Sequence, residues 1–502
     1  MVYKAMANSF FLGLFLLQLT SSCNKSSASN KGSNSENKNQ PKIASQIKNV
    51  TCKLSTYKKD ITAPYFGFNN NSAHGPNWND EKFVSVLENL QPQFLRFPGG
   101  TVSGFWNWKA GNMSGNAPDD DGKKHGASDK FVATLDNFKV SIAATKATPI
   151  FVLNLLTSTL PEQLEMLRYA KKIGLEVSYI EMGNEYYLNR DYYNTKYTSG
   201  TVYAKEASTW VNEIKKEFPN AKFAVGCSRP GSDKDAKSTS WNKEVFEVIK
   251  SNENINAITV HPYSGPGRGI KELKGQMSID DMANVLAASF NGEKLSEFPD
   301  LPKGKKIWVT EYNVFDLKKN IVNSKWAHAL YTMNMTLGML NNKDIEMEIY
   351  HSLVGNPSFR AVFMGKNDLE KLGSSTLTKP YELSAAGLGM RIVLESVKGK
   401  NEAVKIEFQG ATQETFMGKS FEPMNGWLLK GTGADKAIIL NLSSNDFEID
   451  VSQLKLAEGS SYVSYNSDNP VAIVSSIDQI KKNSSIIKSN KATIPAYSVV
   501  VF

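Results

Sequence analysis

Cysteine and histidine are scarce in this chain of 502 residues, which contains 3 Cys and 5 His. The histidines are scattered and no His-Glu-x-x-His motif occurs, so the sequence argues against a metal enzyme and predicts no cofactor. Cys23, Cys52 and Cys227 lie far apart and outside any metal-ligand spacing. If Cys23 is modified, Cys52 and Cys227 either form a disulfide or remain two unpaired thiols, and the sequence leaves both alternatives open.

Dense clusters of one charge are also absent. The chain has 58 Lys and Arg against 50 Asp and Glu, and its formal net charge of +8 is a mild excess for this length. No basic cluster is dense enough to predict nucleic-acid binding. This mild positive charge would favour an acidic polymer slightly over a basic one as a binding partner. With 41% hydrophobic and 22% charged residues, the composition is typical of a globular protein with two or three domains.

The first apolar run, Phe10–Leu19, is too short to span a bilayer as a mature helix. It follows Lys4 and precedes Thr20, two serines and Cys23, the pattern of an export signal. A cysteine after small residues resembles a bacterial lipobox, although Thr20 stands where Leu is commoner. We therefore expect residues 1–22 to be a signal peptide and Cys23 to be the lipid anchor of an exported outer-membrane lipoprotein in the bacterial envelope. An ordinary signal peptide with an incidental cysteine is the alternative.

Residues 23–42 contain almost no apolar side chains. Such a segment cannot bury enough surface to fold, and we expect a disordered tether. Residues 43–63, which follow it, have the alternation of β-strands. We expect them to pair with strands from the C-terminal part of the chain.

From residue 64 onward, short and almost continuously apolar segments alternate with amphipathic stretches. The apolar segments are typical of strands buried on both faces, and they lie at 64–69, 93–100, 148–156, 177–185, 222–227, 257–263, 306–313 and 345–354. Helical patterns follow them at 80–90, 129–145, 161–173, 201–217, 241–251, 277–290, 324–341 and 382–396. Eight strand–helix pairs predict a (β/α)₈ TIM barrel over residues 64–397. A doubly wound sheet is less favoured, because it usually has fewer units and a phosphate-binding turn after its first strand.

After residue 398 the apolar pattern changes to period two, with short segments between polar turns and no long helix. This pattern predicts a C-terminal β-sandwich over residues 398–502. The fold class is therefore α/β, a TIM barrel followed by a β-sandwich that also takes up an N-terminal strand.

Polar and ionisable residues gather at the ends of the predicted barrel strands, and the C-terminal ends of these strands are where barrel active sites form. These residues are Arg96 on the second strand, Asn184 and Glu185 on the fourth, His261 and Tyr263 on the sixth, and Glu311 on the seventh. Such groups cost free energy at a buried strand end unless they pair with one another or with a ligand.

Two glutamates at the ends of strands four and seven would face each other across the barrel mouth. Cleavage of a glycosidic bond needs such a pair, because one carboxylic acid protonates the departing oxygen while a carboxylate attacks the anomeric carbon or activates water. A structural ion pair with Arg or Lys is the alternative for each glutamate. Since Glu185 and Glu311 both lie in polar motifs, the catalytic interpretation is favoured.

Asn184-Glu185 together with Glu311 resembles clan A of the retaining glycoside hydrolases. The resemblance implies that Glu185 is the acid/base, that Glu311 is the nucleophile and that Asn184 hydrogen-bonds the sugar hydroxyl next to the anomeric carbon.

Arg96, His261 and Tyr263 also match positions of that clan. The resemblance implies that Arg96 keeps the nucleophile ionised, and a nearby opposite charge does lower a carboxyl pKa. It implies that His261 and Tyr263 line the cleft and orient the nucleophile.

Within the clan, the segments FLRFPGGTVSGFWNWKAG and TEYNVFD are similar to those of the α-L-arabinofuranosidases and the related heparanase and β-glucuronidase group. The ending IPAYSVVVF is similar too, so the resemblance covers residues 45–502. Two departures concern the sugar subsite. The run Asn69–Asn71 stands where arabinofuranosidases have a sugar-binding Glu, and Tyr350 and His351 stand where many members have a Trp. These departures leave the sugar and the linkage open.

Four further residues are expected to contact substrate: Asn154, Trp106, Tyr350 and His351. Trp106 and Trp108 would either stack on sugar rings or pack their loop onto the barrel. The run Asp119–Asp121 either binds calcium or is a solvated loop tip.

The sequence thus predicts a retaining glycoside hydrolase that acts on a polysaccharide or oligosaccharide by double displacement, with an α-L-arabinofuranosidase or a β-glycosidase as the suggested activities. Carbohydrate is the expected partner, and membrane contact is expected through the lipid anchor alone. Two alternatives are a non-catalytic surface glycan-binding lipoprotein and a transglycosylase that uses the same residues. Exo or endo action and the oligomeric state are left open.

Overall fold

The computed structural model describes residues 48–62, 64–113, 132–231, 235–266, 269–270, 276–290, 294, 296–315, 321–355, 359–365, 380–416 and 419–502. The predicted signal peptide, the Cys23 anchor, the tether and Asp119–Asp121 lie outside these ranges. Among the described helices, none combines the length and the hydropathy that a membrane span requires.

Eight parallel strands close into a barrel, as predicted. In chain order they are β2 (Phe66–Asn69), β3 (Phe94–Phe97), β6 (Thr148–Val152), β7 (Tyr179–Glu181), β8 (Lys222–Gly226), β9 (Ala257–Val260), β12 (Lys306–Val309) and β14 (Ile345–His351). The last strand closes on the first, with Glu348 opposite Phe66. The barrel interior contains one apolar layer that includes Phe94, Tyr179, Trp308 and Ile349.

Helices surround the barrel in the expected order. They are α1 (Glu81–Leu90), α2 (Leu135–Thr145), α3 (Leu160–Lys172), α5 (Gly200–Glu217), α6 (Ala236–Ile249), α7 (Ile279–Ser289), α9 (Trp326–Met339) and α11 (Ala385–Val397), with a short α4 (Asp191–Asn194). Capping residues set several of these starts. Asp235 accepts a hydrogen bond from the Ser238 backbone, so α6 begins before the predicted residue 241. Thr134 caps α2, which therefore begins later than the predicted residue 129.

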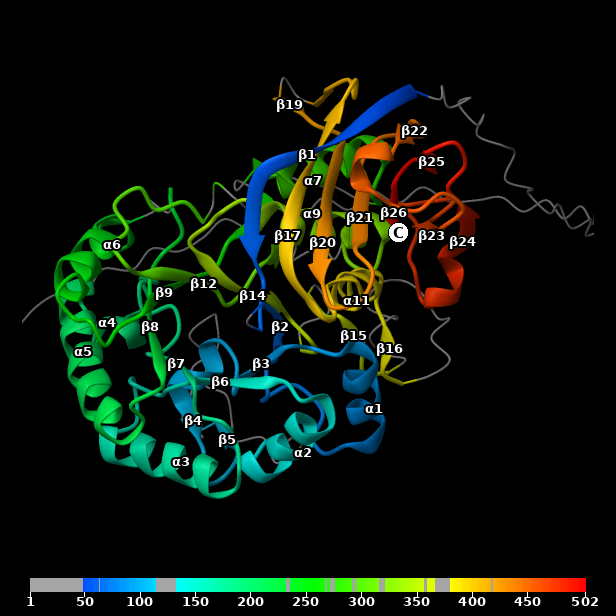
Figure 1. Cartoon of the computed structure of the whole chain (residues 1–502). Helices are drawn as coiled ribbons and strands as arrows, with labels where there is room; N and C mark the ends of the chain where they lie inside the picture. The colour runs from blue at the N-terminus through cyan, green and yellow to red at the C-terminus, as the bar shows by residue number, and fades with distance from the viewer. Residues whose placement is uncertain are drawn as a thin grey trace, which may run out of the picture. The chain divides into compact units, whose positions relative to one another are not determined.

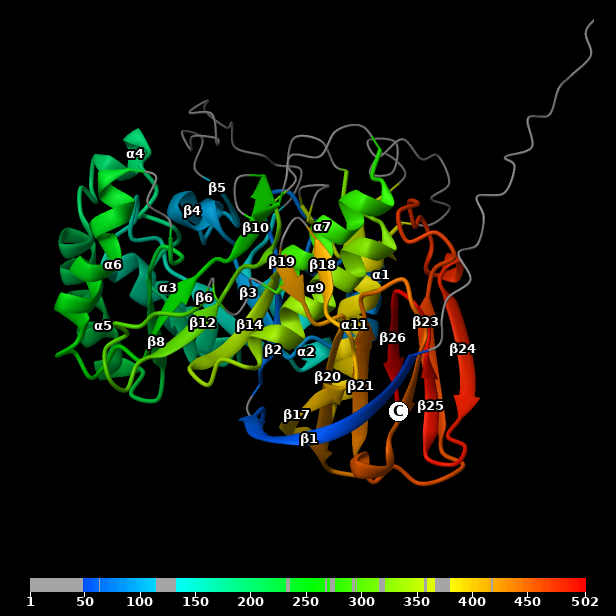
Figure 2. The same ribbon diagram turned by 90° about the horizontal axis from the view of Figure 1, so that it is seen from above.

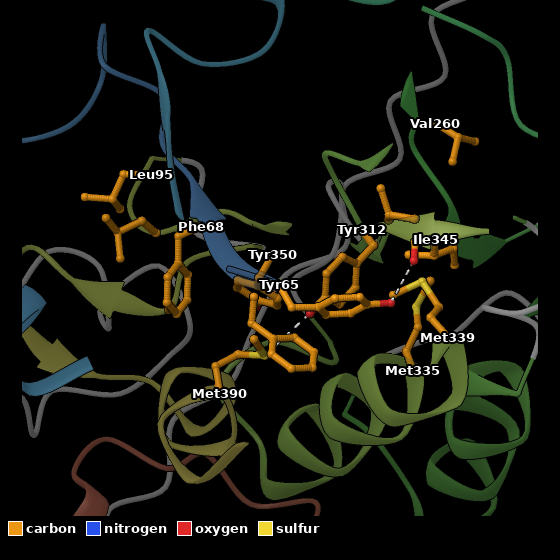
Figure 3. Packing of buried hydrophobic residues seen from close by; sticks show 14 of the residues in the cluster. Tyr65, Phe68, Leu95, Val260, Tyr312, Met335, Met339, Ile345, Tyr350 and Met390 are labelled. Carbon is orange, nitrogen blue, oxygen red and sulfur yellow. Dashed lines mark hydrogen bonds between the residues drawn. The ribbon is translucent and has the colours of Figure 1, made fainter. Parts of the chain in front are cut away.

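Helices α9 and α11 pack against the barrel on the side where the C-terminal sheet also lies (Figures 1 and 2). Figure 3 shows the aromatic and methionine side chains between these helices and strands β2, β12 and β14. The Tyr312 hydroxyl contacts Thr336 of α9 at 2.7 Å and donates to the Met390 sulfur of α11 at 3.6 Å. This layer joins the barrel to its covering helices through buried side chains.

The C-terminal part forms one mostly antiparallel sheet of nine strands, in the order β24-β23-β26-β21-β20-β17-β1-β22-β25. Their bounds are β1 (Lys48–Asp60), β17 (Lys400–Gln409), β20 (Met424–Gly431), β21 (Lys436–Asn441), β22 (Phe447–Asp450), β23 (Ser461–Asn466), β24 (Lys481–Ile486), β25 (Lys491–Ile494) and β26 (Ser498–Val501). The sheet folds over on itself, because the backbone of Thr493 in β25 donates to the Tyr462 hydroxyl of β23. Apolar side chains of both halves share one core, as in a sandwich.

Short pairs of strands lie in the loops. They are β4 (Trp106–Asn107) with β5 (Asn112–Met113), β10 (Tyr263–Pro266) with β11 (Gly269–Ile270) and β13 (Asn313–Val314), β15 (Val362–Phe363) with β16 (Glu382–Leu383), and β18 (Glu414–Phe416) with β19 (Lys419–Phe421).

Strand β1 precedes the barrel in sequence but lies in the middle of the C-terminal sheet, beside β17 (Figure 1). Cys52 pairs with Phe408 of β17, and Val50 pairs with Ile449 of β22. The predicted uptake of an N-terminal strand by the sandwich is therefore confirmed. Hydrogen bonds also join the sheet to α9: Asn425 donates to Asn334 at 2.9 Å, and the Trp326 indole donates to the Tyr497 carbonyl at 2.8 Å.

Cys52 lies in the core of the sandwich and Cys227 in the core of the barrel, and both are unpaired thiols. Of the two alternatives for these cysteines, the structure therefore has the unpaired one. Burial, with the nearby Asp450 charge, raises the pKa of the Cys52 thiol to about 12. Burial also raises the pKa of Cys227 far above its usual value. Neither thiol is a reactive thiolate at neutral pH.

Candidate active site

Polar side chains form a layer above the apolar interior of the barrel, at the C-terminal ends of the strands. Alternate residues of a strand point to the same face, and each site residue follows an interior residue by two. Arg96 follows Phe94, Glu181 follows Tyr179, Thr310 follows Trp308, and His351 follows Ile349. Asn69 is in register with both Arg96 and His351 on the neighbouring strands. The strand pattern therefore brings these groups to one level.

Glu311 accepts hydrogen bonds on both carboxylate oxygens. Its Oε1 accepts from Arg96 Nη1 at 2.8 Å and from Asn69 Nδ2 at 3.1 Å, and its Oε2 accepts from the Tyr263 hydroxyl at 2.7 Å. Burial on its own raises the pKa of this carboxyl, but the charges of His261, His351 and Arg96, with the Tyr263 hydrogen bond, lower it well below its usual range. Glu311 is therefore ionised at any working pH.

Arg96 is itself held by a second glutamate that the sequence analysis did not single out. Glu181 on β7 accepts from Arg96 Nε and Nη2, both at 2.8 Å, and both side chains are fully buried. Asn184 Oδ1 accepts from Nη2 at 2.9 Å. A two-pronged carboxylate contact restricts the orientation of a guanidinium. Glu181 thus aims the remaining nitrogen, Nη1, at Glu311.

Glu185 is less buried than Glu311, with 18% of its side chain exposed against 7%. The backbone at Glu185 has a φ of 52°, and Gly183 just before it has a φ of 85°. A Cβ at Gly183 would lie 2.2 Å from the Tyr186 ring, so the turn that presents Glu185 requires glycine there. Glu185 Oε1 accepts from the Tyr187 hydroxyl at 3.0 Å and lies 2.9 Å from His261 Nδ1.

The two glutamates lie close together. Ligand atoms of Glu185, His261 and Glu311 are all within 4.8 Å of one another. Retaining glycosidases place their two carboxyl groups about 5–5.5 Å apart, whereas inverting enzymes leave about 6.5–9.5 Å for a water molecule. In this chain the ligand atoms of Glu185 and Glu311 lie closer together than the inverting range.

The same three residues are the group of His and carboxylate side chains, among those the structure describes, that could bind a metal ion. Arg96 lies 2.8 Å from Glu311 Oε1. The charge of His261 is also favoured, because its pKa is raised. Arg96 and His261 thus offset part of the negative charge of these carboxyl groups, which weakens the attraction for a metal ion.

His351 and Asn69 occupy the positions where the sequence departs from the arabinofuranosidases. Asn69 Nδ2 lies 2.7 Å from His351 Nδ1, and only an unprotonated ring nitrogen accepts a hydrogen bond from an amide. Burial lowers the pKa of His351, so a neutral ring agrees with this contact. The charge that keeps Glu311 ionised then comes from Arg96 and His261. The Asn69–His351 pair supports the nucleophile carboxylate through the Asn69 amide, which donates to Glu311 Oε1.

Asn184 Nδ2 has no hydrogen-bond partner among the described residues, although it is buried. A Cβ built on Gly100 would lie 2.5 Å from Glu311 Oε1 and 3.7 Å from Asn184 Nδ2. The amide of Asn184 therefore lies beside the nucleophile with a donor available for a ligand oxygen.

The structure thus brings together Arg96, Asn184, Glu185, His261, Tyr263, Glu311 and His351, of the residues that the sequence predicted. It places three others in packing positions. Tyr350 is fully buried, points to the helix layer (Figure 3) and donates to the Phe359 carbonyl. Asn154 uses its amide to hold its own loop and the Trp106 carbonyl. The buried Trp106 ring packs edge-on against Phe97.

Trp108, the second tryptophan of that loop, packs against Tyr169 of α3 with ring centroids 5.7 Å apart. Both tryptophans thus make packing contacts with aromatic rings of the barrel and its helices. Sequence reasoning missed Glu181, Tyr187 and the role of Thr310. A signal for Glu181 was present, because a charged residue inside an apolar barrel strand needs a buried partner of opposite charge.

No protein-family model matches the chain, and no curated protein matches it in sequence. Solved structures match its fold. The α-L-arabinofuranosidase of Thermotoga maritima superposes with a TM-score of 0.65 at 14% identity, over 90% of this chain and 99% of that one. A family 51 α-L-arabinofuranosidase, AbfB from Bifidobacterium longum, gives 0.69 at 14% identity, over 90% and 98%. A 4-O-α-L-rhamnosyl-β-D-glucuronidase from Fusarium oxysporum gives 0.62 at 13% identity, over 91% and 99%.

These identities are low, so the likeness concerns the fold. Barrel and sheet are shared along nearly the whole described chain. The neighbours belong to the group that the sequence motifs resemble, and the resemblance is confirmed at the level of fold.

Proposed function

We propose that this chain is a retaining glycoside hydrolase with Glu311 as nucleophile and Glu185 as general acid/base. The proposal rests on the carboxyl groups of Glu185 and Glu311, which each have an oxygen within 4.8 Å of the other but lie in unlike environments. Glu311 is buried and kept ionised by Arg96, whereas Glu185 is more exposed and lies 2.9 Å from His261 Nδ1. Two carboxyl groups whose surroundings differ in this way suit the roles of nucleophile and acid.

In the first step, an oxygen of Glu311 attacks the anomeric carbon while protonated Glu185 donates its proton to the departing oxygen. Asn69, Arg96 and Tyr263 keep the attacking carboxylate in place through their hydrogen bonds. In the second step, Glu185 takes a proton from water, the water oxygen attacks the anomeric carbon, and Glu311 leaves as a carboxylate. Two inversions give net retention.

Asn184 is the residue we assign to substrate recognition. Its carbonyl oxygen is occupied by Arg96, while its buried Nδ2 has no partner among the described residues. A sugar hydroxyl next to the reacting carbon would satisfy this donor, and an unsatisfied buried amide costs about 1–3 kcal/mol. Since the structural neighbours include arabinofuranosidases and a rhamnosyl-glucuronidase, we propose an α-L-arabinofuranoside or a β-glycoside as substrate.

The test is hydrolysis of a panel of aryl glycosides and polysaccharides by the chain from residue 43 onward. We expect Glu185→Gln to lower kcat/KM by about 10²–10⁴-fold for poor leaving groups, and Glu311→Gln to abolish turnover. Glu165→Gln on the exposed face of α3 is the matched control, because Glu165 contacts only the exposed Lys109. Equal activity in all three variants would contradict the proposal. Glycan binding without hydrolysis by the intact chain would favour the binding-protein alternative.

Azide, added as an external nucleophile, distinguishes the acid/base role of Glu185 from the nucleophile role of Glu311. With Glu185→Ala, azide attacks the glycosyl-enzyme and gives a glycosyl azide of the same anomeric configuration as the substrate. With Glu311→Ala, azide attacks the substrate directly, and a single inversion gives the opposite configuration. Exchanged outcomes would reverse the assignment of Glu185 and Glu311. Transfer of the sugar to an added alcohol instead of water would identify a transglycosylase.

We also propose that the protein is exported and anchored through lipid on Cys23, because the cysteine follows an apolar run and two serines. Metabolic labelling with palmitate in a bacterial host is expected to mark the full-length chain and not the Cys23→Ala variant. Equal labelling of both would overturn this assignment.

A further inference from the structure

The two catalytic glutamates are joined by a continuous series of hydrogen bonds through buried side chains. Glu311 contacts Arg96, which contacts Glu181, and Thr310 donates to Glu181 Oε2 at 3.3 Å. His261 Nε2 lies 3.1 Å from Thr310 Oγ1, and His261 Nδ1 lies 2.9 Å from Glu185 Oε1. His261 is therefore the last member of the series before the acid/base.

Thr310 determines how His261 is protonated. Glu181 accepts two hydrogen bonds from Arg96, whose guanidinium is always charged, so Glu181 acts here as a carboxylate and only accepts. Glu181 cannot donate to Thr310, so the hydrogen bond between them uses the single hydroxyl proton of Thr310. With that proton on Glu181, the Thr310 oxygen accepts from His261, and Nε2 of His261 carries a proton in this arrangement.

The other ring nitrogen faces both catalytic carboxyl groups. Nδ1 lies 2.9 Å from Glu185 Oε1 and 3.9 Å from Glu311 Oε2. The charges that face the ring are Glu185, Glu311 and Arg96. The neutral groups around it are Thr310 and the hydroxyls of Tyr187 and Tyr263, which bond the same two carboxyl groups. Glu181 lies beyond Thr310, and the neutral His351 lies 3.9 Å from Glu311 Oε2.

We propose that His261 remains an imidazolium throughout the reaction and balances one negative charge that moves from Glu311 to Glu185 and back. This inference rests on the proposed function. In the free enzyme the charge is on Glu311, and Glu185 is a neutral acid. Because Glu185 Oε1 accepts from both His261 and Tyr187, its transferable proton is on Oε2.

The charge moves when the chemistry occurs. Glu311 forms a bond to the anomeric carbon and becomes a neutral ester, while the bond to the leaving oxygen breaks and that oxygen takes the proton from Glu185. Glu185 is now the carboxylate, 2.9 Å from the imidazolium. Hydrolysis reverses the transfer: a proton of water goes to Glu185, and the electron pair of the ester bond returns to Glu311. Apart from the Arg96–Glu181 ion pair, one cation and one anion are present at each stage.

The ionisation of His261 agrees with this arrangement. Burial on its own lowers the pKa of the ring, but the charges of Glu311 and Glu185 and the hydrogen bond to Glu185 outweigh burial and the opposing Arg96, and the pKa is raised. Because Nδ1 lies 2.9 Å from Glu185 Oε1 and 3.9 Å from Glu311 Oε2, the ring faces a carboxylate whichever of the two is neutral.

The experiment is ¹⁵N NMR of the chain from residue 43 onward, labelled at histidine, with the His261 signals assigned by their loss in His261→Gln. Glu185→Gln and Glu311→Gln each remove one of the two carboxyl groups that can carry the negative charge, without changing the shape of the side chain. At pH ~7.5, above the usual histidine pKa of ~6.5, we expect both ring nitrogens to be protonated in the wild type and in each single variant, because the remaining carboxyl group carries the charge. The double variant has neither carboxyl group, and we expect its His261 pKa to fall by about 1–3 units and the ring to become neutral.

A neutral ring in the wild type would overturn the proposal, and so would a single variant as neutral as the double. Thr310 supplies a second test that leaves both glutamates in place. Thr310→Val removes the acceptor of Nε2–H and is expected to lower the His261 pKa, whereas Thr310→Ser keeps the hydroxyl and the wild-type ring signals. Equal spectra for these two variants would also contradict the proposal. Turnover assays test the proposed function and the ring signals test the charge balance, so each can fail separately.

Discussion

At the scale of single residues, Arg96 governs the ionisation of the nucleophile. We expect Arg96→Met to raise the pKa of Glu311, because burial is then opposed by fewer positive charges. The acidic limb of the pH profile of kcat/KM should move to higher pH by about 1–3 units, with a lower plateau. Glu181 would lose its buried partner, at a cost of about 3–5 kcal/mol of stability. The control is Arg168→Met, which removes an exposed ion pair with Glu217. A pH profile that does not move would contradict this role.

The same carboxyl should make the stability of the protein depend on pH. The pKa of Glu311 is lower in the folded chain than the ~4.3 of an unfolded glutamate. Ionised Glu311 therefore contributes stability that is fully present above the unfolded pKa and is lost as pH falls through the folded pKa. We expect urea unfolding to show a steeper loss of stability in acid for the wild type than for Glu311→Gln. Parallel curves for the two proteins would exclude the effect.

At the scale of elements, the loop after β3 has a glycine, Gly100, beside the Glu311 carboxylate, and this position has no room for a larger side chain. A Cβ at Gly100 would lie 2.5 Å from Glu311 Oε1, so Gly100→Ala must displace that carboxylate. A displacement of about 1 Å can lower a rate by about 10²-fold, and we expect this loss in kcat with little change in Tm. The control is Gly304→Ala in the loop before β12, where a Cβ would meet nothing within 4 Å although the φ of 84° disfavours alanine. Equal effects of the two substitutions on kcat would contradict the prediction.

The alternation within each strand explains which parts of the site could be predicted. Apolar runs identified the eight barrel strands, and their polar ends identified Glu185, Glu311 and Arg96. Period two also distinguishes His351 from Tyr350: Met347 and Ile349 point into the barrel, so His351 does too, while Tyr350 points to the helices. Applying this rule along β14 would have removed Tyr350 from the predicted contacts.

Other contacts could not be predicted in this way. Asn69 and Thr310 act on side chains from other strands, and their partners depend on the register and radius of the closed barrel. Tyr187 contacts Glu185 within the loop after β7, and this contact depends on the conformation of that loop. Glu181 was recognisable as a buried charge, but its two-pronged contact with Arg96 depends on side-chain geometry that no spacing in one chain reveals. The sequence indicates which strand ends meet, and the structure is needed to say which atoms do.

At the scale of the whole molecule, β1 should be indispensable although it is far from the site in sequence. Deleting residues 1–42 leaves β1 intact, and we expect the wild-type Tm. Deleting residues 1–62 removes the strand between β17 and β22, exposes two sheet edges and takes Val50 and Cys52 out of the sandwich core. Unpaired edges promote aggregation. We expect this chain to unfold at a much lower temperature or to precipitate, as measured by light scattering during heating. An equally stable product would show that the sheet closes without β1.

The position of β1 has a consequence for biosynthesis. The strand is translated early, but its partners Phe408 and Ile449 lie several hundred residues further along the chain. The sheet therefore cannot be assembled until the ribosome has passed β17 and β22, and such distant pairing is slow. A product terminated before these strands would retain an unpaired β1 and be a ready substrate for quality-control proteases. In this way the connectivity links maturation to synthesis of the β17–β22 region.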